Sequence, residues 1–168
     1  RIRARRYDGE WVNDHRHGHG KALLPSGDTW EGGWVGGEPH GEGTMQYMSG
    51  DSYVGGMANG LREGAGVLTY ASGEVHRGDF HLDEASGEGT LVASDGATVL
   101  YKGGWVSDLR CGVGTGRTPS GDDWRGEWAS GLPGGAGEMR YANGDVYEGS
   151  WKAGKMDGEG VWRWSNGT

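Results

Sequence analysis

The chain has 168 residues, among them 38 glycines and 4 prolines, and 16 basic against 24 acidic side chains give it a formal net charge of −8. The single cysteine excludes an intramolecular disulfide framework and fits a reducing, intracellular setting. Its apolar runs fall short of the roughly 20 residues that a membrane span needs, and no signal peptide is recognisable.

The first six residues, 1–6, hold four of the basic side chains. One interpretation of this segment is a positive patch that binds acidic phospholipid or nucleic acid. The other is a solvated strand that belongs to a repeat before the first one described below, as part of a longer array. From Tyr7 onward 12 basic side chains stand against 24 acidic ones. This excess of negative charge is repelled by nucleic-acid phosphates and by anionic membrane surfaces. The sequence therefore predicts no nucleic-acid binding and favours phospholipid binding only weakly.

From Tyr7 onward one unit of about 23 residues is repeated seven times. Each copy has the frame aromatic-x-Gly-x-Trp, then Gly-x-Gly, an apolar alternation and a closing Gly, as in Tyr147-Glu148-Gly149-Ser150-Trp151. A period of 20–50 residues indicates an array in which each unit contacts only its neighbours. The predicted units are residues 7–29, 30–52, 53–75, 76–100, 101–123, 124–146 and 147–168.

Each unit is predicted to be a β-hairpin. In the first, residues 7–12 and 20–24 alternate between apolar and polar, as a strand with one covered face does. Residues 13–18 and 25–28 have the composition of turns. No window keeps the i, i+3, i+4 apolar spacing of an amphipathic helix, so essentially no helix is expected.

Large side chains fall at positions one and five of the repeat, and position three is glycine in all seven units. These three positions share one face of a strand, so the glycine leaves room for a neighbouring ring to lie on the backbone. The core is therefore predicted to be an aromatic ladder, partly open as a groove for a partner. The residues assigned to this groove are Tyr7, Trp11, Trp30, Trp34, Tyr53, Tyr101, Trp105, Trp124, Trp128, Tyr147 and Trp151.

The frame resembles the MORN (membrane occupation and recognition nexus) repeat, and the sixth unit even keeps that family's closing turn as Asn143-Gly144-Asp145. The resemblance covers all seven units. It implies an all-β fold, an elongated, twisted single-layer antiparallel sheet of seven consecutive hairpins. It also implies a non-catalytic scaffold of the cytoplasm, associated with the cytoskeleton, a cilium or flagellum, or a membrane contact. Two units depart from the pattern, with Met57 and Phe80 in place of Trp and His76 in place of the first aromatic residue.

The predicted function is a protein-interaction scaffold without catalytic activity or cofactor. Its aromatic face suits an amphipathic helix or an extended peptide. Its two end strands present unpaired backbone groups. The last strand contains Trp162 and Trp164, which predicts homodimerisation or continuation of the sheet at that edge. The alternatives are the binding of acidic phospholipid and a role as accessory array to a catalytic domain.

A metal site is weakly suggested by His15, His17 and His19, and by Cys111, which occupies the repeat column of His17. Zinc needs ligands at about 2.0–2.3 Å, whereas the same column in neighbouring repeats recurs about every 9–10 Å. No metal site is therefore predicted. The glycine run at 112–116 lacks the Lys-Ser/Thr ending of a phosphate loop, and no enzyme is predicted.

Overall fold

The computed structural model describes residues 7–118 and 120–167, and its regular secondary structure is β-strand throughout. The sequence correctly predicts the all-β class and the near absence of helix. The described residues contain no helix long and apolar enough to cross a bilayer. The basic segment at residues 1–6, with its two interpretations, lies outside the described residues.

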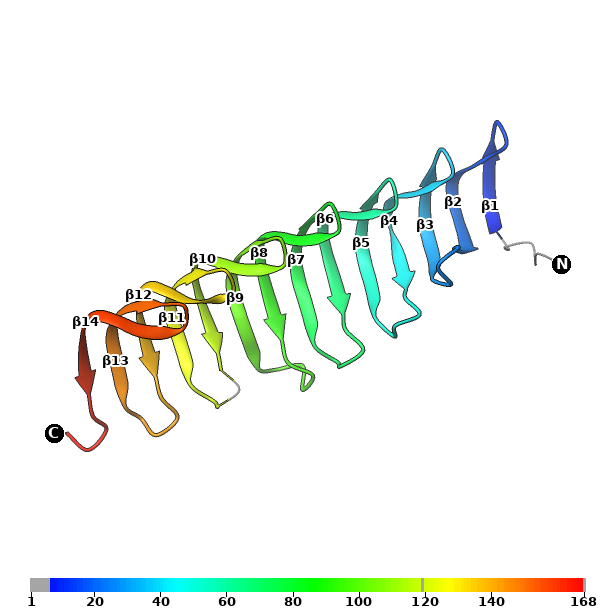
Figure 1. The fold of residues 1–168 in the computed structure, drawn as a ribbon. Helices are drawn as coiled ribbons and strands as arrows, with labels where there is room; N and C mark the ends of the chain where they lie inside the picture. The colour runs from blue at the N-terminus through cyan, green and yellow to red at the C-terminus, as the bar shows by residue number, and fades with distance from the viewer. Residues whose placement is uncertain (1–6, 119, 168) are drawn as a thin grey trace. The chain divides into compact units, whose positions relative to one another are not determined.

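The chain divides into two compact units, Arg1–Glu84 and Ala85–Thr168. Within each unit the strands follow one another in sequence order as a single antiparallel layer (Figure 1). This confirms the predicted single-layer sheet of consecutive hairpins. The first unit contains β1 (Tyr7–Val12), β2 (His15–Leu23), β3 (Thr29–Val35), β4 (Glu38–Gln46), β5 (Ser52–Ala58), β6 (Leu61–Thr69) and β7 (Val75–His81). The strands of the second are β8 (Glu84–Val92), β9 (Val99–Val106), β10 (Leu109–Arg117), β11 (Asp123–Ala129), β12 (Leu132–Arg140), β13 (Val146–Lys152) and β14 (Lys155–Arg163).

A row of glycines crosses the strands of each unit in register. In the second unit Gly126 pairs with Gly137, Gly137 with Gly149, and Gly149 with Gly160. A methyl group on Gly137 would collide with the ring of Trp124, and one on Gly160 would collide with Tyr147. Each position-one ring therefore lies on bare backbone, as the repeat pattern predicts.

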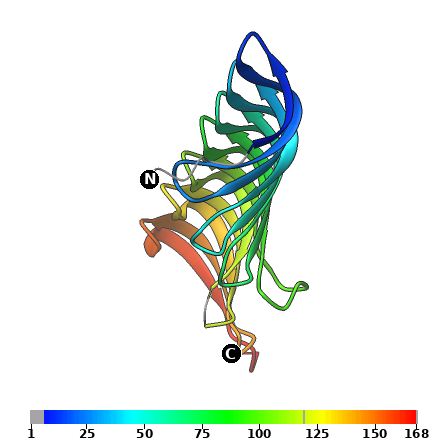
Figure 2. The ribbon, with the colours of Figure 1, turned by 90° about the vertical axis from the view of Figure 1, so that its right-hand side faces the viewer.

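The first glycine of Gly-x-Gly has a different role, because it opens a bulge in the second strand of the hairpin. The pairing of β11 with β12 shifts between Gly126 and Trp128, and Gly135 there has φ +70°. Gly41 has φ +74° at the same place in β4. Only glycine adopts this left-handed conformation at little cost, and a bulge bends the strand. Figure 2 shows strands of both units bending along their length.

The core of each unit is the predicted aromatic ladder. Tyr101 meets Trp105 of its own repeat edge-on at 5.1 Å between ring centroids, and Trp128 of the next repeat at 5.0 Å. Tyr53 meets Phe80 of the following repeat at 5.2 Å. In these repeats the first ring is thus covered by a ring of the repeat after it, and such edge-to-face contacts join neighbouring hairpins.

Candidate functional site

Most residues assigned to the aromatic groove lie in this core. Of the eleven, Trp11 is 58% exposed, Tyr7 is half-buried, and the other nine are at most 7% exposed. Contact between these nine residues and a partner remains a prediction, and at most 7% of the surface of each is available for it. The nine buried residues are Trp30, Trp34, Tyr53, Tyr101, Trp105, Trp124, Trp128, Tyr147 and Trp151.

Hydrogen bonds to the backbone fix several of these rings in place. The hydroxyl of Tyr53 donates to the carbonyl oxygen of Gly56 at 2.9 Å, and that of Tyr101 to Gly104 at the same distance. The indole of Trp30 donates to Gly33 at 3.0 Å. Burial raises the pKa of Tyr53 and of Tyr101 to about 12, so both stay neutral donors at physiological pH.

Arginines cover the rings in alternate repeats, a feature that the sequence reasoning missed. The guanidinium of Arg16 lies 4.4 Å from the centroid of Trp34, and that of Arg62 lies 5.1 Å from Phe80. Arg110 lies 5.1 Å from Tyr101, so the first, third and fifth repeats each place a cation over aromatic rings. A signal was present, because these arginines recur about every two repeats. The last repeat has Met156 at this position, and it is exposed.

The last strand of the second unit presents aromatic rings to solvent. Trp162 and Trp164 are stacked at 4.9 Å between centroids, with their planes 7° apart, and Tyr141 stacks on Trp162 at 5.3 Å. Every residue of β14 is exposed. Among the described residues β14 pairs with β13 alone, so its outer backbone groups meet no other strand. This surface, the β14 edge, consists of residues 155–164.

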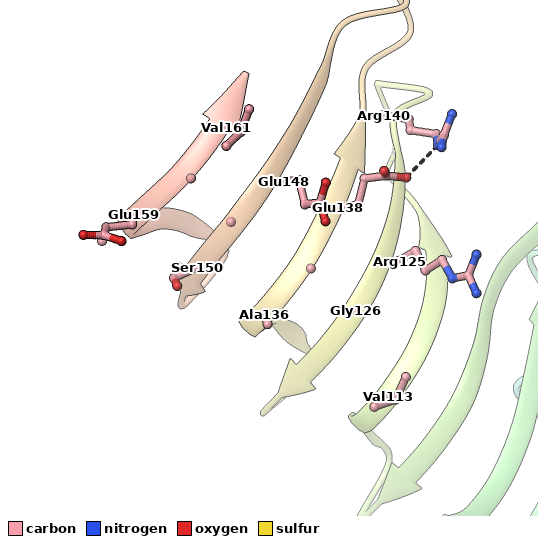
Figure 3. Close-up of a pocket in the computed structure, with 14 residues that line it drawn as sticks. Val113, Arg125, Gly126, Ala136, Glu138, Arg140, Glu148, Ser150, Glu159 and Val161 are labelled. Atoms are coloured by element: carbon pink, nitrogen blue, oxygen red, sulfur yellow. Dashed lines mark hydrogen bonds and ion pairs between the residues drawn. The ribbon is translucent and has the colours of Figure 1, made fainter. Parts of the chain in front are cut away.

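On the face opposite the rings, β10 to β14 form an open hollow of about 1280 Å³ (Figure 3). Its floor includes Gly126, Gly137, Gly149 and Gly160, where the backbone is bare. The residues around this floor are mainly charged. Arg140 forms an ion pair with Glu138 at 2.8 Å, whereas Glu159 forms none with any described residue. The lining side chains include Arg125, Glu138, Arg140, Glu148, Glu159 and Val161.

Among the weak metal candidates, His15 makes a hydrogen bond through its side chain, and the other three make theirs through backbone atoms. His15 Nδ1 lies 2.7 Å from the carbonyl oxygen of Asn13, and the backbone of His19 donates to the Glu10 carboxylate. The carbonyl oxygen of Cys111 accepts from Tyr101 at 3.2 Å, and that of His17 accepts from Tyr7. Within residues 7–118 and 120–167, no three His, Cys, Asp or Glu side chains are grouped so as to hold a metal ion.

Comparison with known proteins identifies the repeat. The family model for the MORN repeat matches at residues 7–29, 30–52, 53–75, 76–98, 101–122, 124–146 and 147–168. A search of curated proteins found no match. Among solved structures, the TCP domain of SAS-4 (dCPAP) of Drosophila melanogaster, in complex with a proline-rich motif of Ana2 (dSTIL), is similar with a TM-score of 0.51. The two are 17% identical over 98% of this chain and 86% of that one, which is a likeness of fold.

Proposed function

The chain belongs to the MORN repeat family, and we propose that it is a non-catalytic scaffold that binds a protein segment at the β14 edge. One observation carries this proposal. Trp162 and Trp164 are 37% and 49% exposed, whereas the nine ladder rings are at most 7% exposed. Adjoining exposed aromatic rings are typical of contact surfaces, because few soluble monomers leave such apolar area in water.

The geometry of the β14 edge favours an extended ligand. Its outer N–H and C=O groups meet no strand among the described residues, so an incoming strand could pair with them. Trp162 and Trp164 lie beside this row of backbone groups, and their stack offers an aromatic surface to the side chains of that strand. The SAS-4 TCP domain, a similar fold, was solved with a proline-rich motif, which supports an extended segment as the class of ligand.

Two finer parts of the proposal rest on the family resemblance alone. They are a cytoplasmic location and an association with the cytoskeleton, a cilium or a flagellum. Phospholipid binding is the weaker alternative, because the chain from Tyr7 onward carries 12 basic against 24 acidic side chains. A helix in the aromatic groove is also less favoured, because nine of the eleven residues assigned to it are buried.

The experiment is a selection of extended peptides from a displayed library against this chain. Enriched peptides should bind in solution, and the variant Trp164→Ala should lose most of that binding. Trp11→Ala is the matched control, since Trp11 is also well exposed but lies on β1. Enrichment of no peptide, or equal binding to both variants, would show that the β14 edge is not a protein-binding surface.

A further inference from the structure

We propose that the first unit binds a proline-rich segment in the polyproline II conformation, across a row formed by Leu24, Tyr47 and Tyr70. The segment carries proline at every third residue and at least one basic side chain. This inference goes beyond the proposed function, because the row lies in the first unit and takes no part in the β14 edge. It follows from the spacing of the row, from its hydrogen-bonding groups and from the charge beside it.

The row is built by strand pairing in the first unit. The last residues of β2, β4 and β6 are aligned across the sheet, through the first residues of β3 and β5. Leu24, Tyr47 and Tyr70 directly follow those last residues, and each begins a turn along the same edge of the first unit (Figure 1). In every one of these turns the N–H and the C=O of the first residue are both hydrogen-bonded, at 2.8–3.0 Å. The three residues are therefore held alike and recur once per repeat.

The spacing of the row matches one ligand conformation. Neighbouring members are two strands apart, so the row recurs about every 9.4–9.8 Å. A polyproline II segment has three residues per turn, so every third side chain returns to the same face after about 9.3 Å. Side chains on one face of a strand recur about every 6.6 Å, and those of an α-helix recur after about 10.5 Å at seven residues. Prolines at every third residue stay in step with the row, and the other two ligands do not.

The side chains of the row are accessible to such a ligand. Tyr70 is 36% exposed and Tyr47 is half-buried, whereas the ladder residue Tyr53 is 0% exposed. Leu24 is half-buried and extends the apolar surface by one repeat. Aromatic rings suit proline-rich ligands, because such a segment is already extended and loses little conformational entropy when it binds.

The Tyr47 hydroxyl supplies a hydrogen-bond donor. The ladder hydroxyl of Tyr53 donates to a carbonyl oxygen of its own repeat, but the hydroxyl of Tyr47 has no such partner among the described residues. Burial is the main cause that raises the pKa of Tyr47, so the hydroxyl keeps its proton. A polyproline II segment has no internal hydrogen bonds, so its carbonyl oxygens can accept from Tyr47. Those of an α-helix are already bonded within the helix.

Carboxylates beside the row favour a basic segment. Each of the three turns ends on an acidic residue, which is Asp28, Asp51 or Glu74. None of the three makes an ion pair with a described residue. Residues 7–84 carry 4 basic against 13 acidic side chains. A segment with Arg or Lys beside its prolines is therefore attracted to this edge.

The first test is the binding of a labelled peptide, measured by fluorescence anisotropy in a Trp164→Ala background that keeps the β14 edge out of the titration. The probe has proline at every third residue, alanine between the prolines and an arginine at each end. Tyr47→Ala and Tyr70→Ala should each raise the dissociation constant at least about tenfold. Leu61→Ala is the matched control, since Leu61 and Tyr70 are 39% and 36% exposed at opposite ends of β6. This control should bind like the background protein.

Further probes and one further variant test the spacing, the charge and the hydroxyl. A peptide of the same composition with proline at every second residue should bind at least about threefold more weakly, because its prolines leave the common face. Replacing both arginines of the probe by glutamate should also weaken binding. Tyr47→Phe keeps the ring and removes the donor, so it should weaken binding less than Tyr47→Ala does.

Two outcomes would overturn the inference. One is equal binding of the two proline spacings, and the other is a pair of variants, Tyr47→Ala and Tyr70→Ala, that bind the probe as tightly as Leu61→Ala. Circular dichroism establishes that each variant is folded before it is titrated. If Tyr47→Ala fails to fold, Tyr70→Ala and the comparison of the two spacings still decide the question.

Discussion

Trp128 and Trp164 are the same residue type in the same unit, yet one is core and the other is surface. Trp128 is 7% exposed, and its ring centroid lies 5.0 Å from that of Tyr101 and 5.3 Å from the guanidinium of Arg110. Trp164 is 49% exposed, and the one ring among the described residues that it stacks on is Trp162. The ring and the arginine that cover Trp128 both belong to the repeat before its own, whereas Trp164 stands at another position of the frame, where Tyr70 of an inner repeat is also 36% exposed.

The proposed binding surface on β14 uses residues of the same repeat frame that builds the core. Tyr53 and Tyr101, at position one of their repeats, are each covered by glycine backbone below and by a ring of the next repeat at the side. On β14, by contrast, Trp162 and Trp164 are 37% and 49% exposed. A stable fold and a contact surface can thus come from one set of residues.

The largest effect should come from removing a covered ring. Trp128→Ala should lower the free energy of unfolding by about 3–5 kcal/mol, because it leaves a cavity beside Tyr101 and beneath Arg110. Trp164→Ala is the matched control and should cost less than about 1 kcal/mol, since little packing is lost at an exposed site. Urea unfolding followed by circular dichroism measures both. Equal costs would contradict the division into core and edge.

A smaller effect should come from filling the space below a ring. In Gly137→Ala the new methyl group meets the Trp124 ring, so the ring must move, at a cost of about 1–3 kcal/mol. Gly134→Ala is the control, because its nearest contact would be the Ala129 Cβ at 3.3 Å and it lacks a positive φ. Thermal unfolding should separate the two variants. Equal melting temperatures would mean that the rings do not depend on bare backbone.

The sequence predicted the parts of the fold that depend on one repeat. Hairpins, the glycine beneath each ring and the aromatic face all follow from spacing within about 23 residues. The family match confirms the identification of the MORN repeat.

Contacts between repeats could not be predicted in the same way. The cover that Trp128 receives from Tyr101 and Arg110 depends on how one hairpin lies against the next, and on a bulge at Gly112 with φ +65°. For this reason the pattern located the groove residues in the ladder but did not reveal that only two of the eleven are appreciably exposed.

The smallest expected effect concerns the last turn, which follows the β14 edge. The carboxylate of Asp145 accepts the backbone N–H of Ser165 at 2.9 Å, which ties the turn before β13 to the turn after β14. This hydrogen bond is the main reason that the pKa of Asp145 lies below its ordinary value. A carboxyl pKa that is lower in the folded state adds stability above the unfolded pKa, and that stability is lost as the pH falls through the folded pKa.

Asp145→Asn should therefore flatten the dependence of stability on pH below about 4, because an amide oxygen still accepts the bond but does not titrate. Thermal unfolding of parent and variant, measured from neutral pH into the acid range, checks this. The two curves should converge as the pH falls, since protonation removes the charge of Asp145 in the parent, whereas the amide of the variant is neutral throughout. Parallel curves would mean that Asp145 does not hold the last turn beside Trp164, and that the aromatic stack of β14 is positioned by its own packing.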